Sequence, residues 1–80
     1  PARETADEIS AAVESQSAEK VGAAAHKLKS SSRSVGAKEL ADLCQILETA
    51  GKSSDWHSIT ESAPQIPVIV QNIIEYVENL

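Results

Sequence analysis

Apolar residues recur every three or four positions along most of the chain, which is the spacing of one face of an amphipathic helix. The first such segment runs from Thr5 to Glu14, and the Thr5-x-x-Glu8 spacing of a capping box predicts that a helix begins there. A short polar connection follows, and Ser17 at its end is placed to cap a second helix. The apolar face of that second helix is predicted to comprise Val21, Ala25, Leu28, Ser32 and Val35.

The same periodicity predicts two more helical segments. Gly36, which can leave the helical conformation at little steric cost, separates the second helix from a third one that should end before Gly51. The apolar face of the third helix is predicted to comprise Ala37, Leu40, Leu43, Cys44 and Leu47. The next loop closes on Asp55 as a cap. One apolar phase then continues to the last residue through Trp56, Ile59, Ala63, Ile66, Val70, Ile73, Val77 and Leu80.

Pro64 and Pro67 interrupt the fourth segment. Each proline lacks a backbone donor and crowds the carbonyl group four residues earlier, so we expect a kink or a brief break near Ala63 to Ile66. Because the apolar phase is unbroken, both halves are expected to face the same core. Four amphipathic segments with short connections predict an all-α fold, an antiparallel up-down four-helix bundle that occupies residues 1–80 as a single domain.

The composition agrees with this fold and excludes several functions. The 80 residues include no Phe, one Trp and one Tyr, so aliphatic side chains and Ala must build the core, which favours close-packed helices. No apolar run approaches the roughly 20 residues needed to cross a bilayer, so no membrane contact is expected. One cysteine, Cys44, and two histidines, His26 and His57, do not form a metal-ligand set of ordinary spacing, and no metal site is expected.

The charge is unevenly distributed along the chain. A net charge of -5 argues against a general nucleic-acid-binding protein, because such domains are usually basic over a whole face. Five of the seven basic residues nevertheless lie between Lys20 and Lys38. An acidic chain therefore has one basic region, which would suit a transferred phosphoryl group or a partner with an acidic pocket.

His26 is predicted to point into solvent. A helix advances about 100° per residue, which places His26 about 160° from Leu28, the centre of the apolar face. Gly22 lies about 120° from that centre, so we expect it to leave room for an approaching partner rather than to permit tight contact with another helix. The outer face around the imidazole is predicted to comprise Gly22, Ala23, Lys29, Ser30 and Arg33.

The second predicted helix contains the string Ala25-His26-Lys27-Leu28-Lys29-Ser30-Ser31-Ser32, followed by Val35-Gly36-Ala37, Leu40, Leu43-Cys44 and Leu47-Glu48. This pattern resembles the histidine-containing phosphotransfer (HPt) domains of multistep phosphorelays, whose hallmark is His-x-Leu-Lys-Gly, a run of small residues and a Gly-Ala or Gly-Leu hinge. The resemblance is strong from about Ala18 to Glu48, and the flanking segments match in pattern only. At Ser30 the family most often has Gly. The serine either narrows the approach to His26 or offers a hydroxyl to the phosphoryl group.

The resemblance implies that His26 accepts a phosphoryl group from a receiver aspartate of a hybrid kinase and passes it to an aspartate of a response regulator. Lys29 would offset charge on the phosphoryl oxygens, and the receiver would supply Mg²⁺. The chain has no Gly-rich phosphate loop, so it is not expected to be an enzyme on its own. The receiver interface is expected to include Gly22, Ala23, Lys27, Ser30 and Arg33, with simple solvation as the alternative for Arg33.

Two other functions are weighed against this one. A noncatalytic helical module could dock an acidic partner through Lys27, Lys29 and Arg33. An RNA-binding bundle is disfavoured by the net negative charge and the scarcity of aromatic residues. A first residue other than Met and the compact length favour a cytoplasmic module at the C-terminus of a hybrid sensor histidine kinase in the inner membrane, with a separate shuttle protein as the alternative. The solvated histidine face and the single core favour a monomer.

Three remaining residues are given structural roles. His57 has no acid or cysteine predicted to pair with it and is expected on the surface. Cys44 is expected in the core as a small apolar residue. Trp56 is expected to anchor one end of the bundle.

Overall fold

The computed structural model describes residues 2–80, and these residues form five α-helices joined by short connections. The helices are α1 (Ala2–Glu14), α2 (Ala18–Ser34), α3 (Lys38–Ser53), α4 (Trp56–Ser62) and α5 (Gln65–Glu78). None of them combines the length and the apolar character that a membrane span requires.

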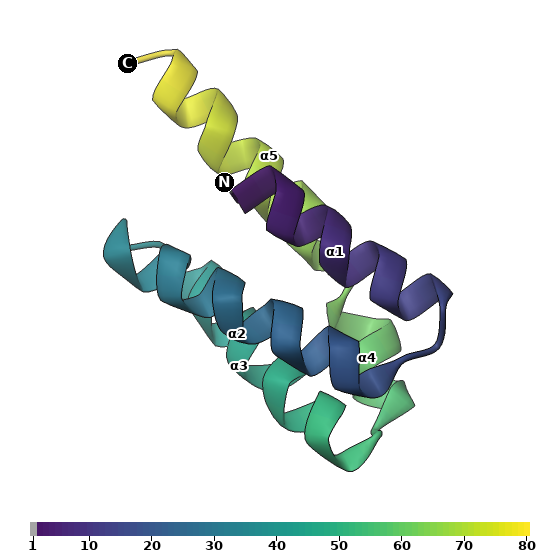
Figure 1. Cartoon of the computed structure of the whole chain (residues 1–80). Coiled ribbons are helices and arrows are strands. Elements are labelled where there is room, and N and C mark those ends of the chain that lie inside the picture. The colour runs from purple at the N-terminus through teal and green to yellow at the C-terminus, as the bar shows by residue number, and fades with distance from the viewer. Residues whose placement is uncertain (1) are drawn as a thin grey trace.

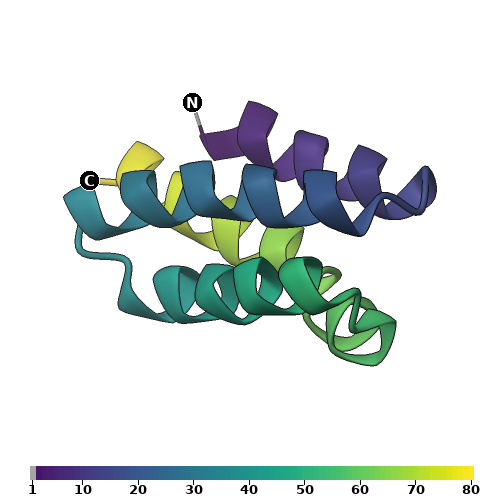
Figure 2. The same ribbon diagram turned by 60° about the horizontal axis from the view of Figure 1, so that its bottom comes forward.

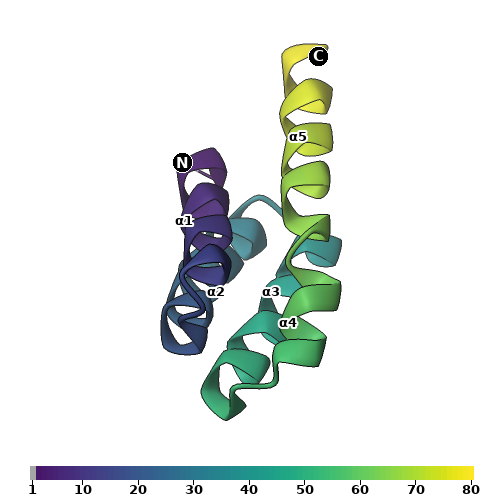
Figure 3. The same ribbon diagram turned by 90° about the vertical axis from the view of Figure 1, so that its right-hand side faces the viewer.

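The helices form an antiparallel four-helix bundle whose last member is divided into α4 and α5. α2 and α3 lie side by side on one side of the molecule, and α1 and α5 lie together on the other (Figures 1 and 2). α4 packs against α3, and the last turns of α5 project past the end of α1 (Figure 3). The predicted all-α four-helix bundle is confirmed.

Side-chain caps begin two of the helices where the sequence predicts them. The Ser17 hydroxyl accepts a hydrogen bond from the backbone N–H of Lys20 at 3.3 Å, which satisfies one free donor in the first turn of α2. The Asp55 carboxylate accepts from the backbone N–H of Ser58 at 3.2 Å and begins α4 in the same way. Both predicted caps are confirmed.

Two predicted helix ends are wrong. α1 begins at Ala2, so Thr5 and Glu8 lie inside the helix and do not cap it, because the residues before Thr5 are also helical. α3 continues through Gly51 to Ser53, and Ser54 is the residue that adopts the left-handed conformation, with φ 54°. Gly51 serves helix packing instead of ending the helix.

The predicted break in the last segment is confirmed. Ala63 and Pro64 separate α4 from α5, and Pro64 immediately precedes α5. Pro67 lies in the first turn of α5, where its missing N–H leaves no intrahelical hydrogen bond unmade. The break allows α4 to pack on α3 while α5 packs on α1.

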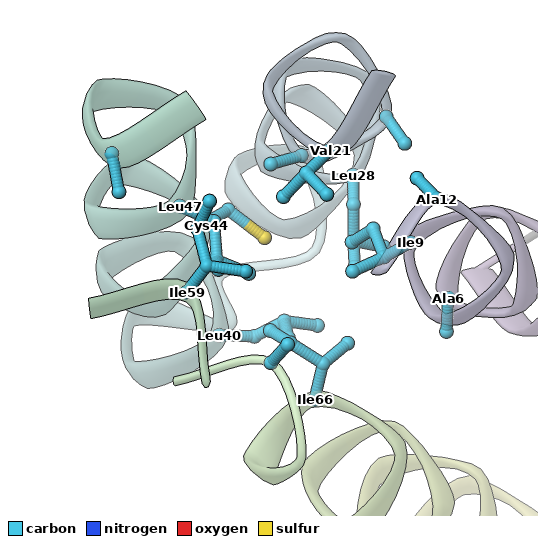
Figure 4. Packing of buried hydrophobic residues seen from close by; sticks show 14 of the residues in the cluster. Ala6, Ile9, Ala12, Val21, Leu28, Leu40, Cys44, Leu47, Ile59 and Ile66 are labelled. Carbon is cyan, nitrogen blue, oxygen red and sulfur yellow. The ribbon is translucent and has the colours of Figure 1, made fainter. Parts of the chain in front are cut away.

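The core is aliphatic and draws on all five helices (Figure 4). Cys44 is fully buried, and Trp56 is half-buried against the core, as predicted. The residues at the ends of two predicted apolar faces are exposed instead: Val35 (73%), Val77 (59%) and Leu80 (87%). Val35 and Val77 line an open groove beside α5. The largest fully buried apolar side chains are Ile9, Leu28, Leu47, Ile59, Ile66 and Val21.

Candidate functional site

His26 lies in the middle of α2 and its side chain is 61% exposed, which confirms the predicted direction. Helical spacing determines this, because His26 is two residues from the fully buried Leu28. Ala23, one turn earlier, and Ser30, one turn later, are small and exposed. The imidazole is therefore open to a second protein.

A carboxylate on the neighbouring helix orients the imidazole. His26 Nδ1 lies 3.1 Å from Oε2 of Glu48 on α3. The other oxygen of Glu48, Oε1, lies 2.5 Å from Nζ of Lys29, and Lys29 also donates to Gln45 Oε1 at 3.1 Å. The Glu48 and Lys29 side chains are only 13% and 11% exposed. His26, Glu48, Lys29 and Gln45 form one connected hydrogen-bond network that begins at the exposed ring and continues between α2 and α3.

The network determines which imidazole nitrogen is free. The hydrogen bond from Lys29 is the main cause that holds the pKa of Glu48 below its ordinary value, against the opposing effect of burial, so this carboxylate is ionised at neutral pH. An ionised carboxylate only accepts hydrogen bonds, which assigns the proton of the neutral ring to Nδ1. Nε2 then holds the lone pair and is the nucleophilic atom.

The structure corrects the placement of two predicted site residues. Gly22 and Lys29 are both buried, whereas the helical projection puts them on the outer face. That projection assumes one packing partner, but α2 contacts both α1 and α3, so its buried arc is wider than a single stripe. Lys29 consequently points at Glu48, and Gly22 faces Gly51 of α3.

The other predicted interface residues surround His26 in different settings. Lys27 is exposed and forms an ion pair with Glu8 of α1, with Nζ 2.8 Å from Oε2. Arg33 is exposed near the end of α2. A groove opens beside His26 between α2 and α3, and it is lined by Glu19, Gly22, Ala23, His26, Lys27, Glu48, Gly51, Lys52 and Ser54.

Reasoning from the sequence missed the second helix of the site. Glu48, Gln45 and Gly51 contribute to it from α3, and Glu48 appears in the motif without a role. The available signal was Glu48 itself, a charged residue directly after the core position Leu47. That signal identifies a site residue only when the helix that faces it is known. His57, predicted to lack an acidic partner, lies 3.3 Å from Glu61 on the exposed side of α4, so that expectation is wrong.

Comparisons with known proteins identify the family. A family model described as Hpt domain matches residues 2–80. No curated protein and no solved structure is significantly similar to the chain. Hpt domains serve phosphorelays as carriers of a phosphoryl group on histidine and interact with receiver domains. The described helices and the exposed histidine agree with this match, and the chain belongs to the Hpt domain family.

Proposed function

We propose that His26 is the phosphoryl carrier of this Hpt domain. Its Nε2 accepts the phosphoryl group from an aspartyl phosphate on the receiver of a hybrid kinase and passes it to an aspartate of a response regulator. The observation that carries the proposal is an exposed imidazole whose Nδ1 is held by Glu48. This arrangement leaves Nε2 directed to the partner.

The transfer needs no proton to move. The Nε2 lone pair forms a bond to phosphorus while the bond between phosphorus and the aspartate oxygen breaks, and the aspartate leaves as a carboxylate. The ring retains its Nδ1 proton and becomes positively charged. The ionised Glu48 lies 3.1 Å from Nδ1 and stabilises that charge. Delivery to the second receiver follows the reverse path.

The proposed role of Lys29 follows from its contacts. Its Nζ is bound to Glu48 and Gln45, so it supports the reaction first by holding the Glu48 carboxylate beside the ring. Direct neutralisation of the phosphoryl oxygens would require it to exchange these contacts. A Lys29→Met variant separates the two roles. If Lys29 acts through Glu48, adding Lys29→Met to the Glu48→Gln variant should slow phosphoryl transfer little further.

The receiver is proposed to dock over the groove beside His26 and to bring the Mg²⁺. Both oxygens of Glu48 are engaged, and residues 2–80 contain no group of three side chains arranged to hold a metal ion. Ala23 and Ser30 allow close approach next to the ring. Lys27 and Arg33 lie at the rim, where they would meet acidic residues of the receiver.

Phosphoryl transfer from a labelled receiver tests the assignment. We expect the wild-type chain to become phosphorylated with an acid-labile, base-stable linkage, and His26→Gln to lose the label. His57→Gln is the matched control, because that histidine is equally a surface residue but lies on α4. Label retained in His26→Gln, or lost in His57→Gln alone, would disprove the assignment. Binding and signalling by His26→Gln at wild-type level would show a docking module instead.

A further inference from the structure

Two glycines face each other in the contact between α2 and α3. Gly22 and Gly51 are both buried. A Cβ atom built at Gly51 would lie 2.7 Å from the carbonyl oxygen of Ala18 and 2.8 Å from Cα of Gly22. These are backbone atoms that cannot rotate away. The two helix backbones therefore touch at a distance that only glycine at position 51 permits.

The two glycines are not equivalent. A Cβ built at Gly22 would lie 3.5 Å from the carbonyl oxygen of Glu48 and 3.6 Å from Cα of Gly51, which are ordinary van der Waals contacts. An alanine therefore fits at position 22 and does not fit at position 51. Glycine is a poor helix former, so Gly51 weakens α3 locally in exchange for the close contact.

This contact adjoins the histidine site. Glu48 precedes Gly51 by three residues and His26 follows Gly22 by four, so each lies about one helical turn from the contact and on the same side. We propose that Gly51 is a positioning residue, which sets the α2–α3 spacing at which Glu48 reaches His26 Nδ1. The inference rests on the proposed function for its significance in phosphoryl transfer, although its geometry is independent of it.

The required precision supports this role. Relief of the contact to about 3.5 Å needs a separation of about 0.7 Å between the helices. An equal displacement of Glu48 would lengthen its 3.1 Å contact with His26 beyond the range of a hydrogen bond. Lys29 has a long flexible side chain and can follow Glu48, whereas the shorter His26 cannot. The His26 contact should therefore be lost first.

Nitrogen-15 NMR of the imidazole measures the effect. At about pH 8.5, where imidazole rings are ordinarily neutral, the wild-type spectrum should show His26 mainly as the Nδ1–H tautomer. Gly51→Ala should shift the tautomer ratio toward Nε2–H by about fivefold or more, the factor expected for loss of one hydrogen bond. Gly22→Ala is the matched control and should leave the ratio unchanged.

A double variant tests the route of the effect. If Gly51 acts through Glu48, Gly51→Ala should change the tautomer ratio little in a Glu48→Ala background. The proposal would be overturned by a wild-type tautomer ratio in folded Gly51→Ala or by an equal shift in Gly22→Ala. It would also be overturned if Gly51→Ala shifted the ratio fully in the Glu48→Ala background. Failure of Gly51→Ala to fold, even with a stabilising osmolyte, would also overturn it, because Gly51 would then serve the whole fold. Failure of wild-type phosphorylation would instead refute the proposed function and leave this result standing.

Discussion

At His26, the ring nitrogen that carries the proton is selected by a residue 22 positions away in the sequence. Glu48 accepts from Nδ1, and Lys29 holds Glu48 from the same helix that carries the histidine. The lysine therefore keeps the carboxylate ionised, and the carboxylate orients the ring. The three side chains act as one unit, so a substitution of Lys29 or Glu48, the two least exposed members, should change the orientation of the exposed His26 imidazole.

The lowered pKa of Glu48 predicts a pH-dependent stability. A carboxyl group whose pKa falls on folding stabilises the native state above its ordinary value of 4.5, and this stability is lost as the pH falls through the lower folded value. Glu48→Gln should be less stable than wild type by about 2 kcal/mol at neutral pH, as expected for hydrogen bonds to charged groups. The difference should shrink as the pH falls below 4.5.

Urea unfolding of both proteins across this pH range measures the difference in unfolding free energy. Glu14→Gln serves as the control, because it removes an exposed carboxylate at the end of α1. A Glu48→Gln deficit that stays constant down to strongly acidic pH would contradict the assigned role of the carboxylate charge.

At the scale of the helices, the connections follow one pattern. After each of α1, α2 and α3, a residue one or two positions beyond the helix end has positive φ: Gln16 (57°), Gly36 (73°) and Ser54 (54°). The N–H of the following residue then bonds to a carbonyl of the last helical turn, as Ala37 does to Ser32 at 2.8 Å and Asp55 to Ala50 at 2.9 Å. Sequence alone indicates this ending at Gly36, because glycine favours it, and does not reveal it at Gln16 or Ser54.

The same substitution at two glycines should have opposite effects on stability. Gly36→Ala places a side chain at φ 73° without any steric contact within 4 Å, so the backbone conformation alone should cost about 1 kcal/mol. Gly22→Ala lies within α2 and makes only ordinary contacts, so it should increase the unfolding free energy by about 0.5–1 kcal/mol. Urea unfolding compares both variants with wild type, and changes of equal sign would contradict this interpretation.

At the scale of the whole molecule, the α2–α3 pair carries the site and the remaining helices cover its inner face. Leu47 and Leu28 are fully buried on that inner face, while His26 lies on the outer one. The histidine is thus placed by the bundle without being part of its core. Substitutions in the core should lower stability without changing the chemistry of a protein that still folds.

The depth of burial predicts the size of such effects. Leu47→Ala should lower the unfolding free energy by about 3 kcal/mol, because it removes a fully buried side chain and leaves a cavity. Val77→Ala on the projecting end of α5 should change it by less than about 0.5 kcal/mol. Chemical denaturation measures both values. A Val77→Ala loss similar to that of Leu47→Ala would show that the end of α5 is packed in solution.

Features that depend on residues close together in the chain follow from the amino-acid sequence alone. Apolar spacing specified the helices and pointed His26 outward, Ser17 and Asp55 marked two helix starts, and the prolines marked the break before α5. Each of these features depends on interactions within a few residues, so it can be predicted without knowledge of the fold.

Which surfaces of the helices are in contact depends on how the helices pack together. Lys29 and Gly22 are buried because α2 has two neighbours, whereas Val35 lies in an open groove beside α5 and stays exposed. The contact of Glu48 with His26 depends on the distance between α2 and α3, which the backbone contact at Gly51 limits. A projection of one helix does not give the distance between two helices. The contact between Glu48 and His26 could therefore be identified only from the packed structure.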